Sequence, residues 1–522
     1  MDTQTRGNPL VIAVDASTTA TKAVAFDPRG ATVAVGRAPL DRSSPQPGWQ
    51  EQDAEAWWRA TTTALRDLAA SIDVANVRAL CITHQRETFV CLDEAGEPLR
   101  PAILWLDTRA ADQIRRLGTA TVHERSGKPP STTPSLYKIA WLAEHEPEVM
   151  RRTATVADVH AFLVERLTGR RVTSWASADP LSVVDMRTFS YAPDLLALAG
   201  LHVDQLPELV APGAILGLMT AAAAGATGLP AGLPIVAGAG DGQCAGIGAA
   251  VTRASLAYLN LGTGLTLGTH ADEYRWSRAY RTLSSPIPGR WMLEALLASG
   301  VLSLAWFRDL VARDREPGAE ERLQRLAADT PPGSGGLLFL PYLTSAETPY
   351  WDPLARGAWV GLRDDHGLGH MYRAILEGIA YEQRLVLDLI EESTGAPVAL
   401  LRAMGGGSRN RLWLQILADV LGRPIAVGDQ VETTALGAGV LAAAGVSLEG
   451  DADLITTAER MTGEWRPMEP SEHRAAVYEV GFEVYRQVYP ALAGLFPRLS
   501  GLATADLRPP FPPGRSDANP DK

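Results

Sequence analysis

One structural plan occurs twice in the chain, once near the N-terminus and once beyond the middle. Leu10–Asp15 (LVIAVD) and Lys22–Asp27 (KAVAFD) are short apolar runs that a polar turn separates. Ser255–Leu261 (SLAYLNL) and Leu265–Thr269 (LTLGT) repeat this order around a Gly-Thr-Gly turn. Runs of this length, joined by short turns, predict β-hairpins. The repetition indicates two halves of similar architecture.

Each hairpin is followed, further along the chain, by a strand that ends in glycine. Pro234–Gly240 (PIVAGAG) precedes Asp241, and Leu400–Met404 (LLRAM) precedes Gly405–Gly407. A glycine-rich strand end that opens onto a helix lets backbone amides face a phosphate. Strands and helices in both halves predict an α/β fold with mixed sheets. The segments with apolar residues at helical spacing are Ala54–Ala70, Leu136–Glu144, Val301–Ala312, His370–Glu392 and Arg411–Leu421.

The length of 522 residues exceeds what one hydrophobic core usually supports, so two domains are expected. We predict an N-terminal domain over residues 1–250 and a C-terminal domain over 251–500. The latter ends with an amphipathic helix over Pro470–Phe496. Residues 501–522 are rich in Pro, Asp and Arg and predict a disordered tail.

The net charge and the cysteines indicate which partners the protein can bind and in which cellular compartment it works. A net charge of −12 and a pI near 5.4 provide no basic surface for nucleic acid. Cys81, Cys91 and Cys244 show no metal or disulfide pattern, which favours reduced thiols in a cytoplasm. The uncharged stretch Pro212–Gly240 is dominated by alanine and glycine and interrupted by proline, so we expect no membrane segment. The sequence leaves a homodimer open.

The first hairpin turn carries residue types that suit a metal and phosphates. Asp15 ends a strand, Thr18 and Thr19 supply hydroxyls, and Lys22 supplies a positive charge. Such a turn can hold phosphates while the carboxylate orients Mg²⁺, directly or through water. A threonine-rich hairpin without a phosphate role is the alternative, and the Walker pattern GxxxxGK[ST] is absent.

Two glycine-bearing turns in the second half are further candidates for phosphate contacts. Gly262-Thr263-Gly264 joins two strands, and Gly405-Gly406-Gly407 with Asn410 opens a helix. Each by itself is compatible with an ordinary tight turn. A nucleotide lying between the two halves would use these turns together with the first hairpin turn.

Two further segments carry side chains suited to a hydroxylated substrate. Asp241, in GAGDG, is placed to accept the proton of an attacking hydroxyl, and the alternative is a helix N-cap. Gln85-Arg86-Glu87 offers donors and acceptors suited to vicinal hydroxyls, with an exposed ion pair as the alternative. We interpret His84 as structural. Asp107 and Arg109 line the same cleft or cap a helix, and the cap is favoured.

Taken together, these segments resemble the FGGY carbohydrate kinases over about Leu10 to Gly445. The resemblance implies two actin-like (ribonuclease H-like) domains with a nucleotide cleft between them. It also implies ATP and Mg²⁺ as cofactors and a small sugar or polyol as the phosphoryl acceptor. Its most specific motifs are DASTTATKAVAFD, ITHQRETFVCLDEAGEPLRPAILWLDTRA, AGAGDG, LFLPYLTSAETPYWDPLARGAWVGL and GGGSRNRLWLQILADVLGRPI.

By this resemblance Asp241 is the catalytic base. Thr18 and Thr19 contact the ATP phosphates. The remaining residues that the resemblance assigns to ATP are Gly262, Thr263 and Gly264 in the second phosphate loop, and Gly406, Gly407 and Asn410 on the adenosine side.

The motifs divide between two subfamilies with different acceptors. Gln85-Arg86-Glu87 resembles the glycerol kinase motif in which Arg and Glu bind the polyol. The segment Leu338–Leu362 and the GGGSRNRLWLQILAD stretch resemble xylulokinases instead. Leu265 and Thr266 stand where glycerol kinases carry an aromatic residue, and Gly242 stands where they carry glutamine, with Gln243 one position later. Ser135 and Leu136 stand where a tyrosine is expected near Pro134.

We therefore expect a ketopentose such as xylulose as the acceptor, with glycerol or another polyol as the alternative. From other classes, a non-metabolic ATPase on the same fold and a sugar-binding regulator without catalysis are the competing hypotheses. The presence of Asp241 and of all three phosphate turns disfavours the regulator.

Overall fold

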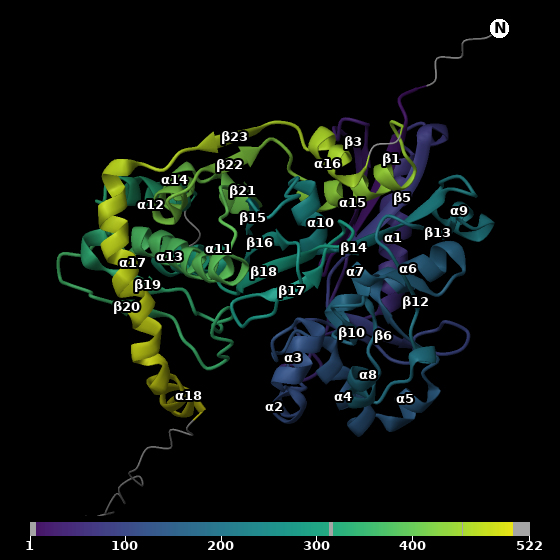
Figure 1. Ribbon diagram of the computed structural model, residues 1–522, viewed down its shortest axis with the longest axis horizontal. Helices are drawn as coiled ribbons and strands as arrows, with labels where there is room; N and C mark the ends of the chain where they lie inside the picture. The colour runs from purple at the N-terminus through teal and green to yellow at the C-terminus, as the bar shows by residue number, and fades with distance from the viewer. Residues whose placement is uncertain (1–6, 313–316, 451–452, 505–522) are drawn as a thin grey trace, which may run out of the picture.

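The computed structural model describes residues 7–312, 317–450 and 453–504. Two large sheets, one in each half of the chain, organise the fold (Figure 1). The strands of the six-stranded N-terminal sheet, in their order across it, are β13 (Ile215–Leu218), β14 (Pro234–Gly240), β5 (Val77–His84), β1 (Leu10–Ala16), β2 (Ala20–Phe26) and β3 (Thr32–Pro39).

The C-terminal sheet repeats this arrangement around its own hairpin. The hairpin strands β15 (Leu256–Leu261) and β16 (Leu265–Ala271) are antiparallel, as β1 and β2 are in the first sheet. Strand β21 (Leu400–Met404) runs parallel to β15, as β5 does to β1. The strands of this seven-stranded sheet, in order, are β17 (Arg281–Ser284), β18 (Trp291–Leu297), β16 (Leu265–Ala271), β15 (Leu256–Leu261), β21 (Leu400–Met404), β22 (Ile425–Gly428) and β23 (Trp465–Met468).

The shorter strands form small separate sheets. Their bounds are β4 (Glu51–Gln52), β6 (Phe89–Leu92), β7 (Ala102–Ile103), β8 (Thr155–Asp158), β9 (Val172–Ser174), β10 (Val184–Asp185), β11 (Ser190–Tyr191), β12 (Glu208–Val210), β19 (Leu338–Leu340) and β20 (Ala358–Val360).

The helices pack on the sheets and between them. Their bounds are α1 (Ala54–Ala69), α2 (Ala111–Leu117), α3 (Ala120–Ser126), α4 (Ser135–His145), α5 (Pro147–Arg152), α6 (Val159–Thr168), α7 (Trp175–Ala178), α8 (Pro193–Ala199), α9 (Ala221–Thr227), α10 (Asp241–Gly248), α11 (Gly300–Val311), α12 (Ala319–Ala328), α13 (Leu368–Thr394), α14 (Arg411–Leu421), α15 (Thr433–Gly445), α16 (Leu454–Met461), α17 (Glu472–Leu492) and α18 (Phe496–Thr504).

The hairpins, the glycine-ended strands and the five predicted helices are confirmed, with bounds that differ by at most a few residues. The predicted C-terminal amphipathic helix corresponds to α17 and the start of α18. Helix α18 continues to Thr504, four residues into the segment predicted as a tail, and residues 505–522 lie outside the described residues.

A helix from late in the chain covers one face of the N-terminal sheet. Alternate side chains of a strand point to opposite faces, so Ile12 and Val14 of β1 pack with α1, while Val11 and Ala13 pack with α15. Figure 1 shows α15 and α16 beside β1 and β5, away from β21 and β22 of the second sheet. The N-terminal sheet is therefore completed by residues from the C-terminal half.

Helices α10 and α15 cross at very short range because glycine occupies both contact points. A Cβ built on Gly437 of α15 would lie 1.9 Å from the carbonyl oxygen of Cys244, and a Cβ on Gly248 of α10 would lie 1.9 Å from that of Thr433. Any side chain there would force the helices apart. The crossing fixes α10, whose first residue is Asp241, against the helix that covers the N-terminal sheet.

The core of the C-terminal half contains a buried acid that makes stability depend on pH. Glu382 of α13 accepts hydrogen bonds from the hydroxyls of Tyr342 (2.8 Å) and Tyr485 (2.7 Å), and burial raises its pKa to about 7. The folded protein therefore holds this proton more tightly than the unfolded chain does. Stability from this proton is present below the unfolded pKa and is lost as pH rises toward 7.

We expect Glu382→Gln to remove this loss. The variant should gain up to about 3 kcal/mol relative to the parent protein between pH 5 and pH 8. Denaturant unfolding at several pH values measures the difference. A constant difference across this range would contradict the prediction.

Candidate active site

Three parallel strands of the N-terminal sheet end at the same edge. Ala16 at the end of β1 pairs with His84 at the end of β5, and His84 pairs with Gly240 at the end of β14. This register brings together Asp15, the segment after β5 and Asp241, which lie far apart in the sequence. The carboxyl ends of parallel strands are where α/β proteins bind ligands.

Asp241 begins α10 at this edge, and its side chain is 46% exposed. One carboxylate oxygen lies 2.7 Å from Nε of Arg86, and the same oxygen accepts a hydrogen bond from the amide of Gly242 at 2.8 Å. The N-cap position belongs to Gly240, so the alternative reading of Asp241 as an N-cap is wrong. A half-exposed carboxylate beside one guanidinium can accept a proton from a bound hydroxyl.

Five side chains of alternating charge contact one another in the order Asp241, Arg86, Glu294, Arg281 and Glu87, and we call this series the charge chain. Arg86 Nη2 lies 3.0 Å from Oε1 of Glu294, which Arg281 contacts at 2.5 Å. Arg281 Nη1 in turn lies 2.7 Å from Oε1 of Glu87. Glu294 and Arg281 belong to β18 and β17 of the C-terminal sheet, whereas Arg86 and Glu87 follow β5 of the N-terminal sheet. All four side chains are at most 8% exposed. The reading of Gln85-Arg86-Glu87 as an exposed ion pair is therefore wrong.

The central carboxylate of this chain stays ionised despite its burial. Burial by itself would raise the pKa of Glu294, but the guanidiniums of Arg86 and Arg281 lower it to about 2. The hydroxyl of Tyr258 donates to its other oxygen at 2.7 Å. Glu294 is thus a fixed negative charge between two arginines.

Gly242 has to be glycine because the charge chain occupies the space beside it. A Cβ at this position would lie 2.3 Å from Oε2 of Glu294 and 2.8 Å from Nη2 of Arg86. This explains the absence of the side chain that glycerol kinases are expected to carry here. The absence of a side chain at Gly242 leaves space for the charged side chains of Glu294 and Arg86. The sequence predicts a different role for this glycine, the close approach of a ligand to the backbone.

Asp15 lies at the end of β1 beside an ion pair that joins the two halves. Lys22 Nζ contacts Oε2 of Glu432, the residue before α15, at 2.8 Å. Burial, together with the charges of Asp241 and Glu432, raises the pKa of Asp15 to about 7, although Lys22 opposes the shift. Asp15 and Asp241 are therefore neighbouring carboxylates whose charges repel.

This pair of carboxylates fits a phosphate-bound Mg²⁺. The ion usually takes one or two protein carboxylates and completes its shell with phosphate oxygens and water. Among the described residues there is no group of three or more acidic, His or Cys side chains that forms a metal cage by itself. Asp15 stays the predicted metal contact.

Part of the predicted site serves as internal support. Thr18 Oγ1 donates to Gln85 Oε1 at 2.9 Å and accepts from Trp105 Nε1 at 3.0 Å, while Gln85 Nε2 donates to Gln52 at 3.2 Å. Thr19 is exposed. The side chains of Thr18 and Gln85 therefore hold the first turn against the segment after β5.

The two glycine-bearing turns of the C-terminal half lie side by side. Asn260 at the end of β15 pairs with Met404 at the end of β21, so Gly262-Thr263-Gly264 adjoins Gly405. Gly405 has φ of 81°, and a Cβ there would lie 2.6 Å from Oδ1 of Asn260. A residue with a side chain is excluded on both grounds.

The following residues open α14. Gly406 is exposed, Gly407 is partly exposed, and Asn410 caps α14 by accepting a hydrogen bond from the amide of Trp413 at 3.1 Å. A helix N-terminus preceded by exposed glycines is suited to a negatively charged ligand.

The sequence did not reveal several site residues. Lys128 is fully buried, and burial lowers its pKa to about 8, which Asp179 at 3.7 Å only partly opposes. Arg281, Glu294 and Tyr258 were also missed. Tyr258 and Glu294 are marked only as a polar and a charged residue inside largely apolar strands, and Arg281, the first residue of the polar β17, carries no such signal.

Other predicted residues lie in structural networks. His84 is buried, with Nδ1 2.8 Å from the carbonyl oxygen of Gln85, which agrees with a structural role. Asp107 is paired with Arg109 at 2.7 Å, and Arg109 stacks over the ring of Trp49 at 3.8 Å. Neither residue caps α2, whose N-cap is Ala110, so the predicted cap is wrong.

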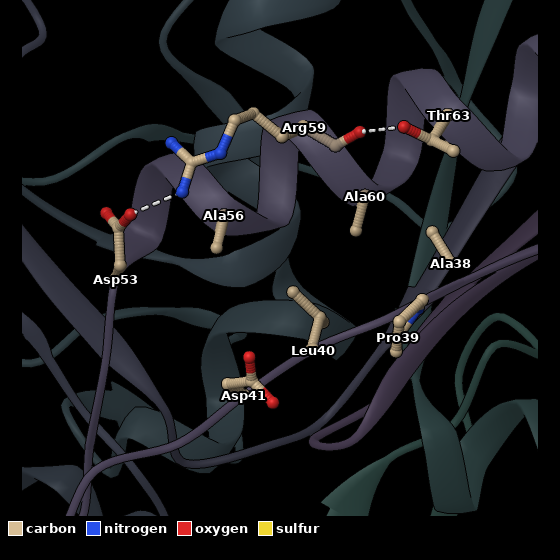
Figure 2. A pocket seen from close by; sticks show the side chains of 9 residues that line it. All are labelled: Ala38, Pro39, Leu40, Asp41, Asp53, Ala56, Arg59, Ala60 and Thr63. Atoms are coloured by element: carbon tan, nitrogen blue, oxygen red, sulfur yellow. Dashed lines mark hydrogen bonds and ion pairs between the residues drawn. The ribbon is translucent and has the colours of Figure 1, made fainter.

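A hollow of about 440 Å³ lies elsewhere on the N-terminal half, between the end of β3 and α1. Figure 2 shows that alanine and proline line much of it and that its one drawn ion pair joins Asp53 and Arg59 at 2.6 Å. None of its lining residues belongs to the predicted site.

Comparison with known proteins shows which family this chain belongs to. Residues 10–248 match the N-terminal domain of the FGGY family of carbohydrate kinases, and residues 257–446 match its C-terminal domain. The chain belongs to the FGGY family of carbohydrate kinases. It is therefore a phosphotransferase that acts on a hydroxyl of a sugar or polyol, as the sequence predicts.

Named relatives include two kinds of kinase. The chain is 33% identical to glycerol kinase of Alkalilimnicola ehrlichii over 458 residues, which cover 84% of this chain and 91% of that protein. It is 30% identical to xylulose kinase of Escherichia coli over 495 residues, which cover 93% of this chain and 100% of that protein. The crystal structure of xylulose kinase from Rhodospirillum rubrum superposes with a TM-score of 0.86 at 30% identity, over 93% of this chain and 99% of that one.

Within the described part of the chain, no helix is both long and apolar enough to span a bilayer. The three cysteines are buried free thiols, as expected.

Proposed function

We propose that this protein transfers the γ-phosphoryl group of ATP, with Mg²⁺, to a hydroxyl of a ketopentose such as xylulose, in the cytoplasm. The observation that carries the proposal is the position of Asp241. It is the half-exposed carboxylate at the edge where three parallel strands end, and it lies beside Arg86.

ATP would lie between the two sets of turns. The exposed Thr19 and the cation of Lys22 approach its phosphates from one side, and Gly262-Thr263-Gly264 with Gly406 approaches from the other. When bound, Mg²⁺ neutralises charge on the transferred phosphoryl group. Asp15 is the residue that would hold it.

Asp241 acts on the acceptor. The attacking hydroxyl gives its proton to the Asp241 carboxylate as its oxygen forms a bond to the γ-phosphorus. The bond from that phosphorus to the bridging oxygen breaks, which leaves ADP and a sugar phosphate. Arg86 holds the carboxylate at 2.7 Å and so fixes its direction. Closure of the two halves around the reactants would exclude water.

Two observations favour a ketopentose over glycerol. The E. coli xylulose kinase is matched over its whole length, and Gly242 leaves no room for the glutamine expected in glycerol kinases. Glycerol stays the second candidate because the chain carries Gln85-Arg86-Glu87 and resembles several glycerol kinases.

A coupled assay of ADP release across ketoses, polyols and aldonates tests the proposal. We expect the highest kcat/KM with a ketopentose. A higher value with glycerol would replace the proposed acceptor. ATP turnover that no hydroxyl compound stimulates would favour an ATPase on the same fold.

A further inference from the structure

The carboxylate that should bind a polyol is engaged by the opposite domain. An Arg–Glu pair can hold a small triol because the guanidinium donates to one hydroxyl while the carboxylate accepts from its neighbour. Here Glu87 accepts instead from Arg281 Nη1 at 2.7 Å, and both side chains are 4% exposed. An acceptor hydroxyl would have to displace a buried charge-assisted contact to use this oxygen.

The backbone holds Glu87 in this arrangement. Its φ of 55° is unusual for a residue with a side chain, and it persists only where surrounding contacts fix it. The hydroxyl of Ser135 donates to the carbonyl oxygen of Glu87 at 2.9 Å, and Arg281 holds its carboxylate. Ser135 and Leu136 stand where the glycerol kinase resemblance predicts a tyrosine, so the segment on this side of the site also departs from that pattern.

Arg281 is itself held firmly. Its second terminal nitrogen contacts Glu294, and Glu294 also contacts Arg86. Strand β17, which begins with Arg281, pairs with β18, which carries Glu294, so the two residues face each other across the ladder. This rigid pair of the C-terminal domain reaches both charged residues of the Gln85-Arg86-Glu87 segment.

We propose that Arg281 is a specificity-determining positioning residue of the acceptor site. Arg281 binds Glu87 from the opposite domain, so the Glu87 carboxylate is not available to accept a hydrogen bond from a three-carbon triol. Arg281 thereby favours a longer polyhydroxy acceptor, which has further hydroxyls to bind elsewhere. This inference rests on the proposed kinase function and deepens it.

The test compares two acceptors in matched variants. Arg281→Thr suits a strand and frees Glu87, and kcat and KM are measured with glycerol and with D-xylulose. We expect the ratio of kcat/KM for glycerol to that for xylulose to rise roughly tenfold or more, mainly through a lower KM for glycerol. Affinity for ADP, measured by calorimetry, should stay unchanged.

Arg275→Thr is the control. Arg275 lies shortly before β17, is 39% exposed and pairs with Glu273 at 3.1 Å, so its removal should leave the ratio unchanged. A general loosening of this region would move both variants alike.

Arg281→Lys keeps the test decisive if Arg281→Thr does not fold. One ammonium group cannot hold Glu87 and Glu294 with the planar fork of arginine, so the ratio should shift in the same direction by a smaller amount. An unchanged ratio in a folded variant, equal losses with both acceptors, or glycerol as the best acceptor of the unmodified protein would overturn the inference. A parent protein that phosphorylates no acceptor would instead overturn the proposed function.

Discussion

Asp241→Asn should lower turnover by about two to four orders of magnitude, because the amide cannot take a proton from the acceptor hydroxyl. Asparagine has the same shape and keeps an oxygen that can accept from the amide of Gly242. The fold and the nucleotide affinity should therefore survive. Steady-state kinetics with saturating ATP and acceptor measures the loss, and ADP titration shows whether binding is intact.

Asp272→Asn is a suitable control for this variant. Asp272 is 73% exposed and pairs with Arg290 at 2.9 Å, outside the charge chain. It should turn over at the parent rate. If Asp241→Asn also retained that rate, Asp241 would not be the base.

Gly437→Ala should reduce both stability and activity. The added methyl group would lie 1.9 Å from the carbonyl oxygen of Cys244, which is a main-chain atom that cannot rotate away. Forcing α10 and α15 apart should cost about 1–3 kcal/mol or more of the free energy of unfolding. Because α10 begins at Asp241, turnover should fall as well. Denaturant unfolding and kinetics on the same sample measure both effects.

Gly225→Ala is the matched control for a helical glycine. Gly225 lies inside α9, and a Cβ there meets nothing within 4 Å. Alanine is the better helix former, so this change should stabilise the protein by about 0.5–1 kcal/mol. If Gly437→Ala also stabilised the protein, the close contact between α10 and α15 would be contradicted.

Most elements that position the site follow from local sequence. The β1 strand is an uninterrupted apolar run that ends at Asp15, and β14 ends in glycine before Asp241, so both strands and their functional ends were predictable. The glycine content of Gly262-Thr263-Gly264 and of Gly405–Gly407 likewise predicts turns at these positions. They lie side by side because β15 and β21 are parallel neighbours.

The charge chain was not predictable because its partners are distant in sequence. Glu87 and Arg281 are 194 residues apart, and no local pattern marks their contact. For Thr18 and Gln85, the residue types indicated ligand contacts, but their polar atoms bond to each other. Side-chain chemistry predicts what a residue is able to bind, whereas only the fold determines which partner it meets.

The position of α15 late in the sequence affects how the protein folds during synthesis. During synthesis, β1, β5 and β14 emerge long before Thr433–Gly445, so one side of their sheet has only the partial cover of α7 and α10 until most of the chain has left the ribosome. Expressing residues 1–250 separately should therefore yield an aggregating fragment, and adding the remaining chain in trans should rescue it. We therefore expect the two halves to fold as one unit, because they share the core between the N-terminal sheet and α15.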